Sequence, residues 1–329
     1  MNSAETDYRK LKESIAAQGL FLKAPLYFST ISAIYFTLLT ASIAILLICK
    51  NLPIQIANVF LFTFALVQLS FIGHDLAHHQ IFSSRIVHLA IGGLWWNLLL
   101  GIGLGRWESK HNKHHANPNE IYKDPDIDQP FIFANEQYRN GGVVSKKILA
   151  LQHLYFFPLL TLAQISLIKG SVTHFTESKK TIYDYTEIAL QLTHYTALFA
   201  IIFYSLGLLY GAVFTASSSL LIGAYLGLTF APNHKGRPII KSAMPPFVQQ
   251  IITARNIKPG MFSDIIYGGL NYQIEHHLFP SMPRPNLHKA RKYVKEFCLK
   301  NNIPYHETSI VGSLVEIYQG LKSPLADAI

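Results

Sequence analysis

The sequence predicts an all-α integral membrane protein with four transmembrane helices in two hairpins. Only 14% of the 329 residues are charged and half are hydrophobic, whereas a soluble domain has about 25% charged residues. The mean hydropathy is +0.23. A segment of about 20 apolar residues is long enough to cross a bilayer. Four segments without Lys, Arg, Asp or Glu meet this condition, at residues 29–49, 53–73, 188–209 and 211–230.

The first hairpin begins in the cytoplasm, because the polar N-terminal residues include Arg9, Lys10 and Lys12 and cytoplasmic segments carry an excess of such residues. These polar residues do not form a cleavable signal peptide. Segment 29–49 crosses outward. Lys50-Asn51-Leu52-Pro53 forms a tight turn, with Pro suited to start the next helix, and segment 53–73 returns to the cytoplasmic boundary.

Two further apolar segments are predicted to be re-entrant or to lie at the membrane interface. Segment 86–104 has His79 just before it and His111 just after it, so its two ends can serve one metal site only if both lie on one face. Segment 148–168 is flanked by lysines at both ends, which favours entry and exit on the same side. The glycines of Gly101-x-Gly103-x-Gly105 indicate a turn or close packing, because a dinucleotide loop needs a preceding strand and another spacing.

The second hairpin, residues 188–230, completes a single predicted domain over residues 1–329. Its cytoplasmic cap comprises residues 74–185 and 231–329. Of the 28 Lys and Arg residues, only Lys50 falls outside the cell in this topology. The net charge of +9 is therefore interpreted as a topology signal rather than as a nucleic-acid surface. A basic helix is predicted at 286–300; packing under the cap is favoured over binding to an anionic membrane or an acidic electron donor.

Histidines carry the chemistry, since eight of the 15 lie in three clusters. Neutral imidazole is the commonest protein metal ligand, and spacings of three and four place rings on one face of a helix. His79 points partly away from His74, and whether it is a ligand stays open. His234 follows the last crossing and is a ninth candidate. One metal needs three or four ligands, so this number suggests two metals. The clustered residues are His74, His78 and His79; His111, His114 and His115; and His276 and His277.

The histidine pattern favours a His-rich di-iron centre over other kinds of metal site. A zinc protease would need His-Glu-x-x-His, which is absent. A carboxylate di-iron bundle would need two Glu-x-x-His motifs, and only Glu108 begins one. A metal transporter would hold its ligands near the bilayer midplane. A His-rich di-iron centre fits best. Several residues are candidates to orient the imidazoles through their second ring nitrogen, namely Asp75, Glu108, Asp264, Gln273 and Glu275.

The three histidine boxes, their order and the paired hairpins resemble the membrane fatty acid desaturases. The resemblance runs from about His74 to Leu287, and its most specific part is Asn271-Tyr272-Gln273-Ile274-Glu275-His276-His277-Leu278-Phe279-Pro280, which is similar to the third box of front-end and related bacterial acyl desaturases. It implies two non-haem iron ions, with ligands at the box histidines and a further histidine matching His234. Many eukaryotic front-end enzymes carry a fused cytochrome b5 domain; no such domain is expected here.

The resemblance implies an O2-dependent desaturase that introduces a double bond into an acyl chain of coenzyme A or of a lipid. The electrons are expected from a separate donor of the ferredoxin or cytochrome b5 type with its reductase. An alternative is a membrane di-iron hydroxylase or ketolase, and a metal carrier is a third class. The catalytic face is expected to be cytoplasmic. Candidate anchors for the substrate head group are Arg106, Trp107, Lys110, Lys113 and Lys123; their charges could equally serve topology and solvation.

Overall fold

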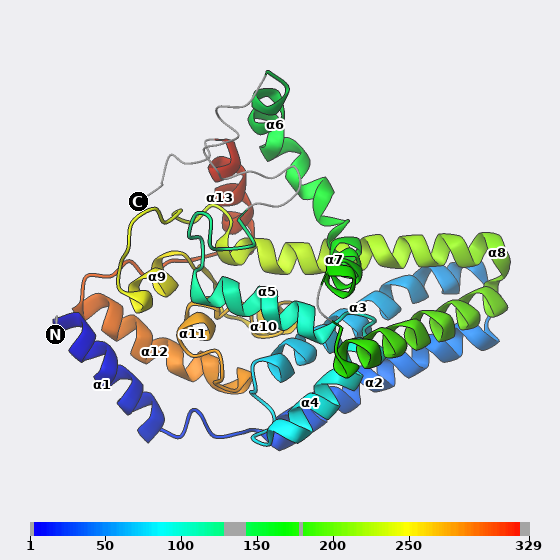
Figure 1. Ribbon diagram of the computed structural model, residues 1–329, viewed down its shortest axis with the longest axis horizontal. Coiled ribbons are helices and arrows are strands. Elements are labelled where there is room, and N and C mark those ends of the chain that lie inside the picture. Colours follow the sequence, from blue (N-terminus) through cyan, green and yellow to red (C-terminus); the bar gives the residue numbers. More distant parts are fainter. Residues whose placement is uncertain (1–2, 128–142, 178–179, 323–329) are drawn as a thin grey trace. The chain divides into compact units, whose positions relative to one another are not determined.

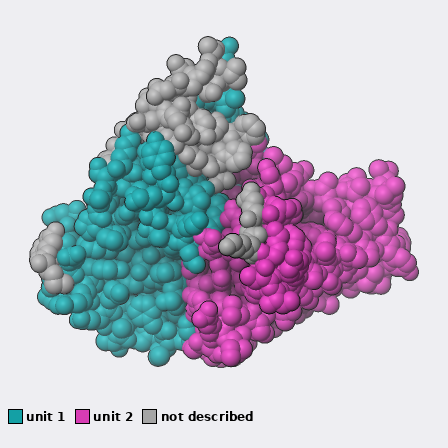
Figure 2. Space-filling view, in the orientation of Figure 1, with its two compact units in different colours: residues 1–23, 110–158, 228–329 teal, residues 24–109, 159–227 magenta. Residues whose placement is uncertain are grey.

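The computed structural model describes residues 3–127, 143–177 and 180–322 (Figure 1). Most of these residues are helical, as predicted. In addition, β1 (Asn256–Ile257) and β2 (Glu307–Thr308) form a two-stranded parallel sheet that the sequence did not predict. The chain forms two compact units (Figure 2). Unit 1 comprises residues 1–23, 110–158 and 228–329, and unit 2 comprises residues 24–109 and 159–227.

Unit 2 is built on the hairpin of α2 (Pro25–Ile48) and α3 (Leu52–Ala77). These helices confirm the first two apolar helices predicted from the sequence. Pro25 starts α2, and Asn51 caps α3 by accepting a hydrogen bond from the Ile54 backbone N–H at 3.1 Å. A buried polar contact joins the two helices, because the Ser42 hydroxyl donates to the Asn58 side chain at 2.7 Å.

The second predicted hairpin is a single helical element, α8 (Ile182–His234), that is broken at Gly207. Gly207 has φ 71° and ψ −179°, a conformation that glycine adopts readily, and the chain turns back there (Figure 1). The predicted break lay three residues later, at Tyr210. Most of α8 belongs to unit 2, and its last residues, 228–234, belong to unit 1.

The segments between the hairpins are bent. The first consists of α4 (Arg85–Gly93), the π-helix η1 (Leu94–Leu99) and α5 (Leu104–Ala116). Its two helical arms meet at 106°, a bend that a broken span and a re-entrant segment would share, so the re-entrant path stays a prediction. The second consists of α6 (Val143–Leu160) and α7 (Ala163–Glu177), which are also sharply bent.

Close packing explains two glycines of unit 2. Gly101 has φ +69°, and a Cβ there would lie 2.5 Å from the His194 ring, so the glycine run serves a turn and close packing, as expected. A Cβ on Gly223 of α8 would lie 2.0 Å from the Thr161 carbonyl oxygen, at the break between α6 and α7.

Three helices of the described residues, α2, α3 and α8, are long and apolar enough to cross a membrane, and the number rises to five if each bent pair is one span. The central helix is α3, since 61% of its apolar window is buried, against 17% for α2. The predicted basic helix is present as α12.

Unit 1 contains the remaining helices, of which α1, α9, α11 and α12 contribute to one apolar core. This core includes Ile15, Ile251, Ile274 and Val294. Tyr8 of α1 stacks on Phe247 of α9 with ring centroids 4.8 Å apart. The helices of unit 1 not yet given are α1 (Ser3–Ala17), α9 (Pro246–Ile252), α10 (Met261–Ile266), α11 (Gln273–Leu278), α12 (Arg284–Lys300) and α13 (Ile310–Lys322). Parts of the predicted cap, residues 128–142 and 178–179, lie outside the described residues.

Candidate metal centre

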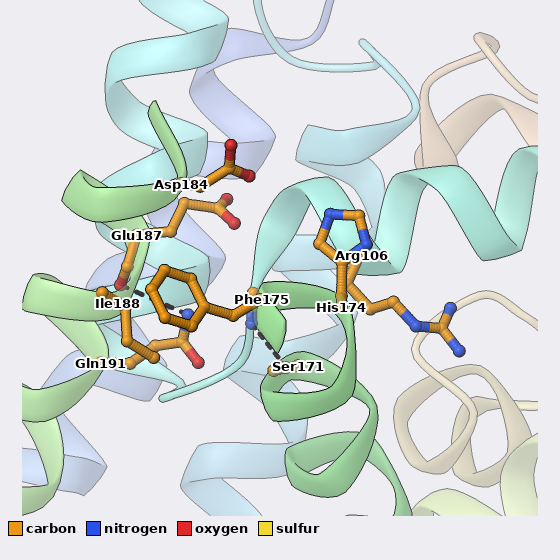
Figure 3. A pocket seen from close by; sticks show the side chains of 9 residues that line it. Arg106, Ser171, His174, Phe175, Asp184, Glu187, Ile188 and Gln191 are labelled. Atoms are coloured by element: carbon orange, nitrogen blue, oxygen red, sulfur yellow. Dashed lines mark hydrogen bonds between the residues drawn. The ribbon is translucent and has the colours of Figure 1, made fainter. Parts of the chain in front are cut away.

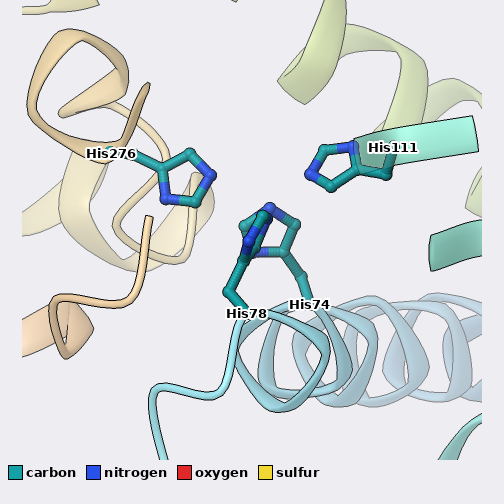
Figure 4. Close-up of side chains that lie close together, drawn as sticks. All are labelled: His74, His78, His111 and His276. Atoms are coloured by element: carbon teal, nitrogen blue, oxygen red, sulfur yellow. The ribbon is translucent and has the colours of Figure 1, made fainter. Parts of the chain in front are cut away.

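The first histidine box lies at the C-terminal end of α3 in unit 2. His74 and His78 are 3% and 8% exposed, and their ring centroids are 4.5 Å apart. One helical turn separates them, so both rings extend from the same side of α3 (Figure 4). Their ligand nitrogens lie within 4.8 Å of each other. This pair can therefore bind one metal ion, as the sequence predicts.

Tryptophan side chains hold this end of α3. The indole N–H groups of Trp95 and Trp96 donate to the carbonyl oxygens of Leu69 and Gly73, each at 2.9 Å. Trp107, which the sequence suggested as a head-group contact, packs against the His74 ring with centroids 5.6 Å apart. Its indole is thus part of the wall around the first box.

Asp75 and His79 differ in their surroundings. Asp75 is buried, and its Oδ1 lies 3.6 Å from His74 Nδ1, which is longer than a hydrogen bond, so its orienting role stays a prediction. His79 is exposed and has φ 54°, and its ring stacks on His88 with centroids 3.8 Å apart. Glu108 lies beside the same histidine, 3.3 Å from His88 Nε2. His79 and Glu108 thus flank a histidine outside the three boxes.

Unit 1 brings together three imidazoles from α5, the end of α8 and α11. The Nε2 atom of His234 lies 3.3 Å from Nε2 of His114 and 2.9 Å from Nε2 of His277. His114 and His277 are 4% exposed. The three rings come from parts of the chain more than forty residues apart in sequence, yet their nitrogens converge on one point.

Each of these rings is held at its other nitrogen by an acceptor. His114 Nδ1 lies 3.0 Å from the Asp124 carboxylate, and His234 Nδ1 lies 3.0 Å from the Thr253 carbonyl oxygen. His277 Nδ1 lies 2.7 Å from Oε1 of Gln250. These acceptors have no hydrogen to donate, so each Nδ1 carries the proton, and a neutral ring then leaves its Nε2 as a bare acceptor.

Gln250 also fixes its own orientation. Its Nε2 donates to the His115 carbonyl oxygen at 2.7 Å, so its Oε1 must face His277. Gln250 therefore links the backbone of the second box to a ring of the third. Sequence reasoning missed Gln250, Thr253 and Asp124. Asp124 lies in an Asp-Pro-Asp run that indicates a turn rather than a metal site, and the other two carry no sequence signal.

The donor set of this cluster fits a metal ion. Three Nε2 atoms face one another, with the Gln273 amide nitrogen also 3.1 Å from that of His234, and a cation would satisfy their lone pairs. Burial and the neighbouring imidazoles of His115, His234 and His114 hold the pKa of His277 well below its ordinary value. The neutral form, which is the form that binds metal, is therefore favoured at this position.

A second group of imidazoles lies beside the first in unit 1. Nε2 of His111 is 3.1 Å from Nε2 of His115, and the His115 ring stacks on His277 with centroids 4.2 Å apart. The ligand nitrogens of His111 and His276 lie within 4.8 Å of each other (Figure 4). Unit 1 thus gathers six of the predicted ligands, the three rings of the second box and those of His234, His276 and His277.

The polar residues of the third box differ in what they contact. Gln273 reaches the cluster, since its Nε2 lies 3.1 Å from His234 Nε2. Glu275 is fully buried and accepts from Asn256 Nδ2 at 2.7 Å and from the Tyr305 hydroxyl at 2.8 Å. Burial raises the pKa of Glu275, against the opposing effect of these two donors. Through these two hydrogen bonds, the Glu275 side chain connects α11 to β1 and to the segment before β2.

The remaining carboxylates and lysines are mostly paired. Asp264 accepts from Asn271 Nδ2 at 2.7 Å. Lys110 forms an ion pair with Asp126, whose Oδ2 lies 3.7 Å from His114 Nδ1. Burial acts to raise the pKa of Asp126, but Lys110 and His114 hold this pKa well below its ordinary value. Two head-group candidates of unit 1 lie at its surface: Lys123, 2.5 Å from Glu120, and Lys113, which is exposed.

Arg106, another head-group candidate, lines a small polar pocket of unit 2 (Figure 3). Glu187 lies in this pocket and accepts from the Gly105 backbone N–H at 3.0 Å and from Asn97 Nδ2 at 3.2 Å. Ser171 accepts from the Gly103 backbone N–H at 2.9 Å. None of the nine lining residues is a box histidine, so this pocket shares no residue with the candidate metal centre.

Comparison with known proteins agrees with the histidine pattern. Residues 52–309 match the model of the fatty acid desaturase family. An acyl-lipid (9-3)-desaturase of Physcomitrium patens is 32% identical over 325 residues, which cover 96% of this chain and 62% of that protein. A Delta(5) fatty acid desaturase of Caenorhabditis elegans is 31% identical over 329 residues, covering 93% of this chain and 70% of the relative. A Delta(6)-fatty-acid desaturase of the same organism is 32% identical, covering 91% and 70%.

Proposed function

Because this chain belongs to the fatty acid desaturase family, we propose that it is an O2-dependent oxidoreductase that introduces a double bond into a fatty acyl chain. The observation that carries the proposal is the convergence of the Nε2 atoms of His114, His234 and His277, whose rings are each held at Nδ1 by an acceptor. Such an arrangement has the chemistry of a transition-metal site built of neutral ligands.

The proposed centre holds two iron ions through histidines of all three boxes and His234, as the family resemblance implies. One group of ligands would be His114, His234 and His277, and a second would include His111, His115 and His276. His74 and His78 of the first box would complete the set. His79 is left out of this proposal because it is exposed and stacks on His88. When bound, the iron ions supply the activation of O2 that protein side chains lack.

The overall reaction balances with an external donor. Two hydrogens leave adjacent methylenes of the acyl chain, and O2 takes up these together with two electrons and two protons to give two molecules of water. The residues of this chain would orient the ligands and exclude water. Asp124, Thr253 and Gln250 keep the Nδ1 protons in place, and burial of His114 and His277 keeps the centre dry.

The topology proposed is four crossings in two hairpins, with the histidines on the cytoplasmic face. Its support is the length of α8, which has 53 residues and would extend about 80 Å if straight, more than twice the roughly 30 Å hydrocarbon core. The break at Gly207 allows two crossings. The single domain over residues 1–329 also stays a proposal.

The substrate class and the electron donor follow from chemistry and from the named relatives. An acyl chain, carried by a lipid or by coenzyme A, is proposed because the relatives are named as acyl-lipid and fatty acid desaturases. This chain spans 62% of the length of the moss relative. A ferredoxin or cytochrome b5 type protein with its reductase would supply the electrons. Arg106, Lys113 and Lys123 remain candidates for the head-group contact.

The experiment that tests the function is expression of the chain in a host whose fatty acids are then analysed by gas chromatography and mass spectrometry. New unsaturated acyl chains are expected, and they should be lost in a His277→Ala variant that is still inserted in the membrane. Hydroxylated lipids alone would favour the hydroxylase alternative. Metal uptake without any O2-dependent change in lipids would instead support a metal carrier.

A further inference from the structure

A short apolar surface projects from unit 1 just before the third histidine box. It is formed by three side chains of α10, Met261, Phe262 and Ile265, which are 83%, 67% and 45% exposed. Lys258, just ahead of them, is exposed as well. Large apolar side chains held together in water are unfavourable, and such patches mark binding surfaces. We name these three residues the α10 tip.

The α10 tip is held firmly rather than loosely. The Ser263 hydroxyl donates to the carbonyl oxygen of Lys258 at 2.9 Å and so closes the turn that starts α10. At the other end, Asn271 Nδ2 donates to Asp264 Oδ1 at 2.7 Å, and the Ile257 backbone N–H donates to the Asn271 carbonyl oxygen at 3.0 Å. Asn271 lies two residues before α11, so the tip and the third box form one bonded piece.

The α10 tip also lies near the end of a membrane-spanning helix. The Arg255 backbone N–H donates to the Asn233 carbonyl oxygen at 2.9 Å, in the last turn of α8. Six residues separate Arg255 from Met261, so the tip lies within about 20 Å of that turn. Residues 228–234, the end of α8, belong to unit 1 together with the tip, so this proximity is internal to the unit.

The size and composition of the α10 tip fit lipid better than a protein partner. A stable protein interface covers about 800 Å² on each side, whereas three side chains offer a few hundred Å² at most. Interfacial helices carry apolar residues on one face and Lys or Arg beside them, and they reach roughly 5–10 Å into the headgroup boundary. Phe262 and Met261 with the neighbouring Lys258 have this composition, and the one acidic side chain of α10, the exposed Asp264, is held by Asn271.

We propose that α10 is a membrane-surface anchor, in which Met261, Phe262 and Ile265 insert at the headgroup level of the bilayer and fix the depth of the third histidine box. The bilayer contact is transmitted through Asp264 and Asn271 to α11, which carries His276 and His277. The anchor depends on the fold of unit 1 and on the bilayer, and it holds whichever reaction the metal centre performs.

The test measures the depth of Phe262 in the full chain reconstituted in phosphatidylcholine nanodiscs. Phe262→Cys carries an environment-sensitive fluorophore in a Cys49→Ala background. The remaining thiol, Cys298, is buried, and burial raises its pKa to about 12, so it reacts slowly. Quenching is measured with nitroxides attached to lipid acyl chains near the carbonyl group and with a water-soluble quencher. The matched control is Leu299→Cys on α12, an apolar residue that is 82% exposed.

The fluorophore at position 262 is expected to be quenched at least twofold more by the lipid nitroxide than that at position 299, and to be shielded from the water-soluble quencher, because a depth of about 5–10 Å removes it from water. Equal quenching of the two positions by lipid would overturn the proposal. The proposal would also be overturned if the fluorophore at position 262 were shielded from the water-soluble quencher only when several copies of the protein share a nanodisc. The same holds if this shielding appeared only after an acidic redox protein is added. The measurement involves neither iron nor acyl product, so failure of the anchor is distinct from failure of the proposed function.

Discussion

Replacing Gln250 by Leu should weaken metal binding strongly, although Gln250 itself is not a ligand. The substitution removes the acceptor 2.7 Å from His277 Nδ1 and the donor 2.7 Å from the His115 carbonyl oxygen. The His277 ring, 4% exposed, then has a buried N–H without its partner. It can exchange its proton to Nε2, and a protonated Nε2 cannot bind a metal.

The expected magnitude follows from these two bonds. Loss of a group that orients a ligating histidine lowers metal affinity by about 10–100-fold, or roughly 1.4–2.7 kcal/mol. The unsatisfied buried N–H should also lower the free energy of unfolding by about 1–3 kcal/mol. The assay is competition between the purified full-length protein and a chelator of known affinity, together with thermal unfolding of the metal-free protein.

The neighbouring residue provides a matched control. Gln249 is 7% exposed, and its Nε2 donates to the Pro118 carbonyl oxygen at 3.1 Å and lies 3.5 Å from Glu120 Oε2. Gln249→Leu should lower stability by a similar amount and leave metal affinity within about twofold, which corresponds to the roughly 0.5 kcal/mol within which independent sites do not affect each other. Equal losses of affinity in the two variants, or wild-type affinity in Gln250→Leu, would refute the orienting role of Gln250.

Three further predictions concern the metal and the fold. His114→Ala and His276→Ala should each abolish activity and lower bound iron, measured by product analysis and metal content. Asp75→Asn should weaken metal binding by about 10–100-fold, measured by the same chelator competition. Glu316→Gln should lower the free energy of unfolding by about 1–3 kcal/mol, because Arg255, which is 0% exposed, loses its ion-pair partner at 2.9 Å and keeps its hydrogen bonds to the carbonyl oxygens of Pro232 and Lys235.

Each of these three predictions has a control variant, an outcome that would contradict it, or an expected dependence on pH. His288→Ala on the exposed face of α12 should keep full iron, and full activity of His114→Ala would contradict the ligand set. Unchanged iron in Asp75→Asn would contradict its role. Burial acts to raise the pKa of Glu316, but Arg255 and His306 hold this pKa below its ordinary value of 4.5. The ionised Glu316 therefore stabilises the fold above that pH, and the deficit of Glu316→Gln should shrink as the pH falls below it. A deficit independent of pH would contradict the ion pair.

The long apolar helices and the box histidines were predictable because their signals are local. Absence of charge over twenty residues is a property of one segment, and α2 and α3 agree with the predicted segments to within a few residues at each end. The spacing of His74 and His78 alone places both rings on one face of a helix. The break in α8 was displaced, because Gly207 interrupts a run that is apolar on both sides and nothing in composition distinguishes it from Gly211.

The residues that hold the ligands were not predictable because their partners are far away in sequence. Gln250 bonds to His115 across 135 residues, and Asp124 reaches His114 through a turn whose conformation the sequence does not specify. A glutamine in an apolar stretch has no pattern that indicates a metal site. The short sheet of β1 and β2 was missed for the same reason, since each strand has two residues and pairs with a segment fifty residues away.

The turns of unit 2 are tied together by Lys50, whose ammonium group donates to the Ser205 carbonyl oxygen at 2.8 Å, two residues before Gly207. The helices that lead away from this bond have similar lengths, about 36 Å for α2 and about 39 Å for α3. This bond opposes sliding of one hairpin along the other when the lipid layer becomes thicker or thinner. We therefore expect the protein to be most active in membranes whose thickness matches these helices.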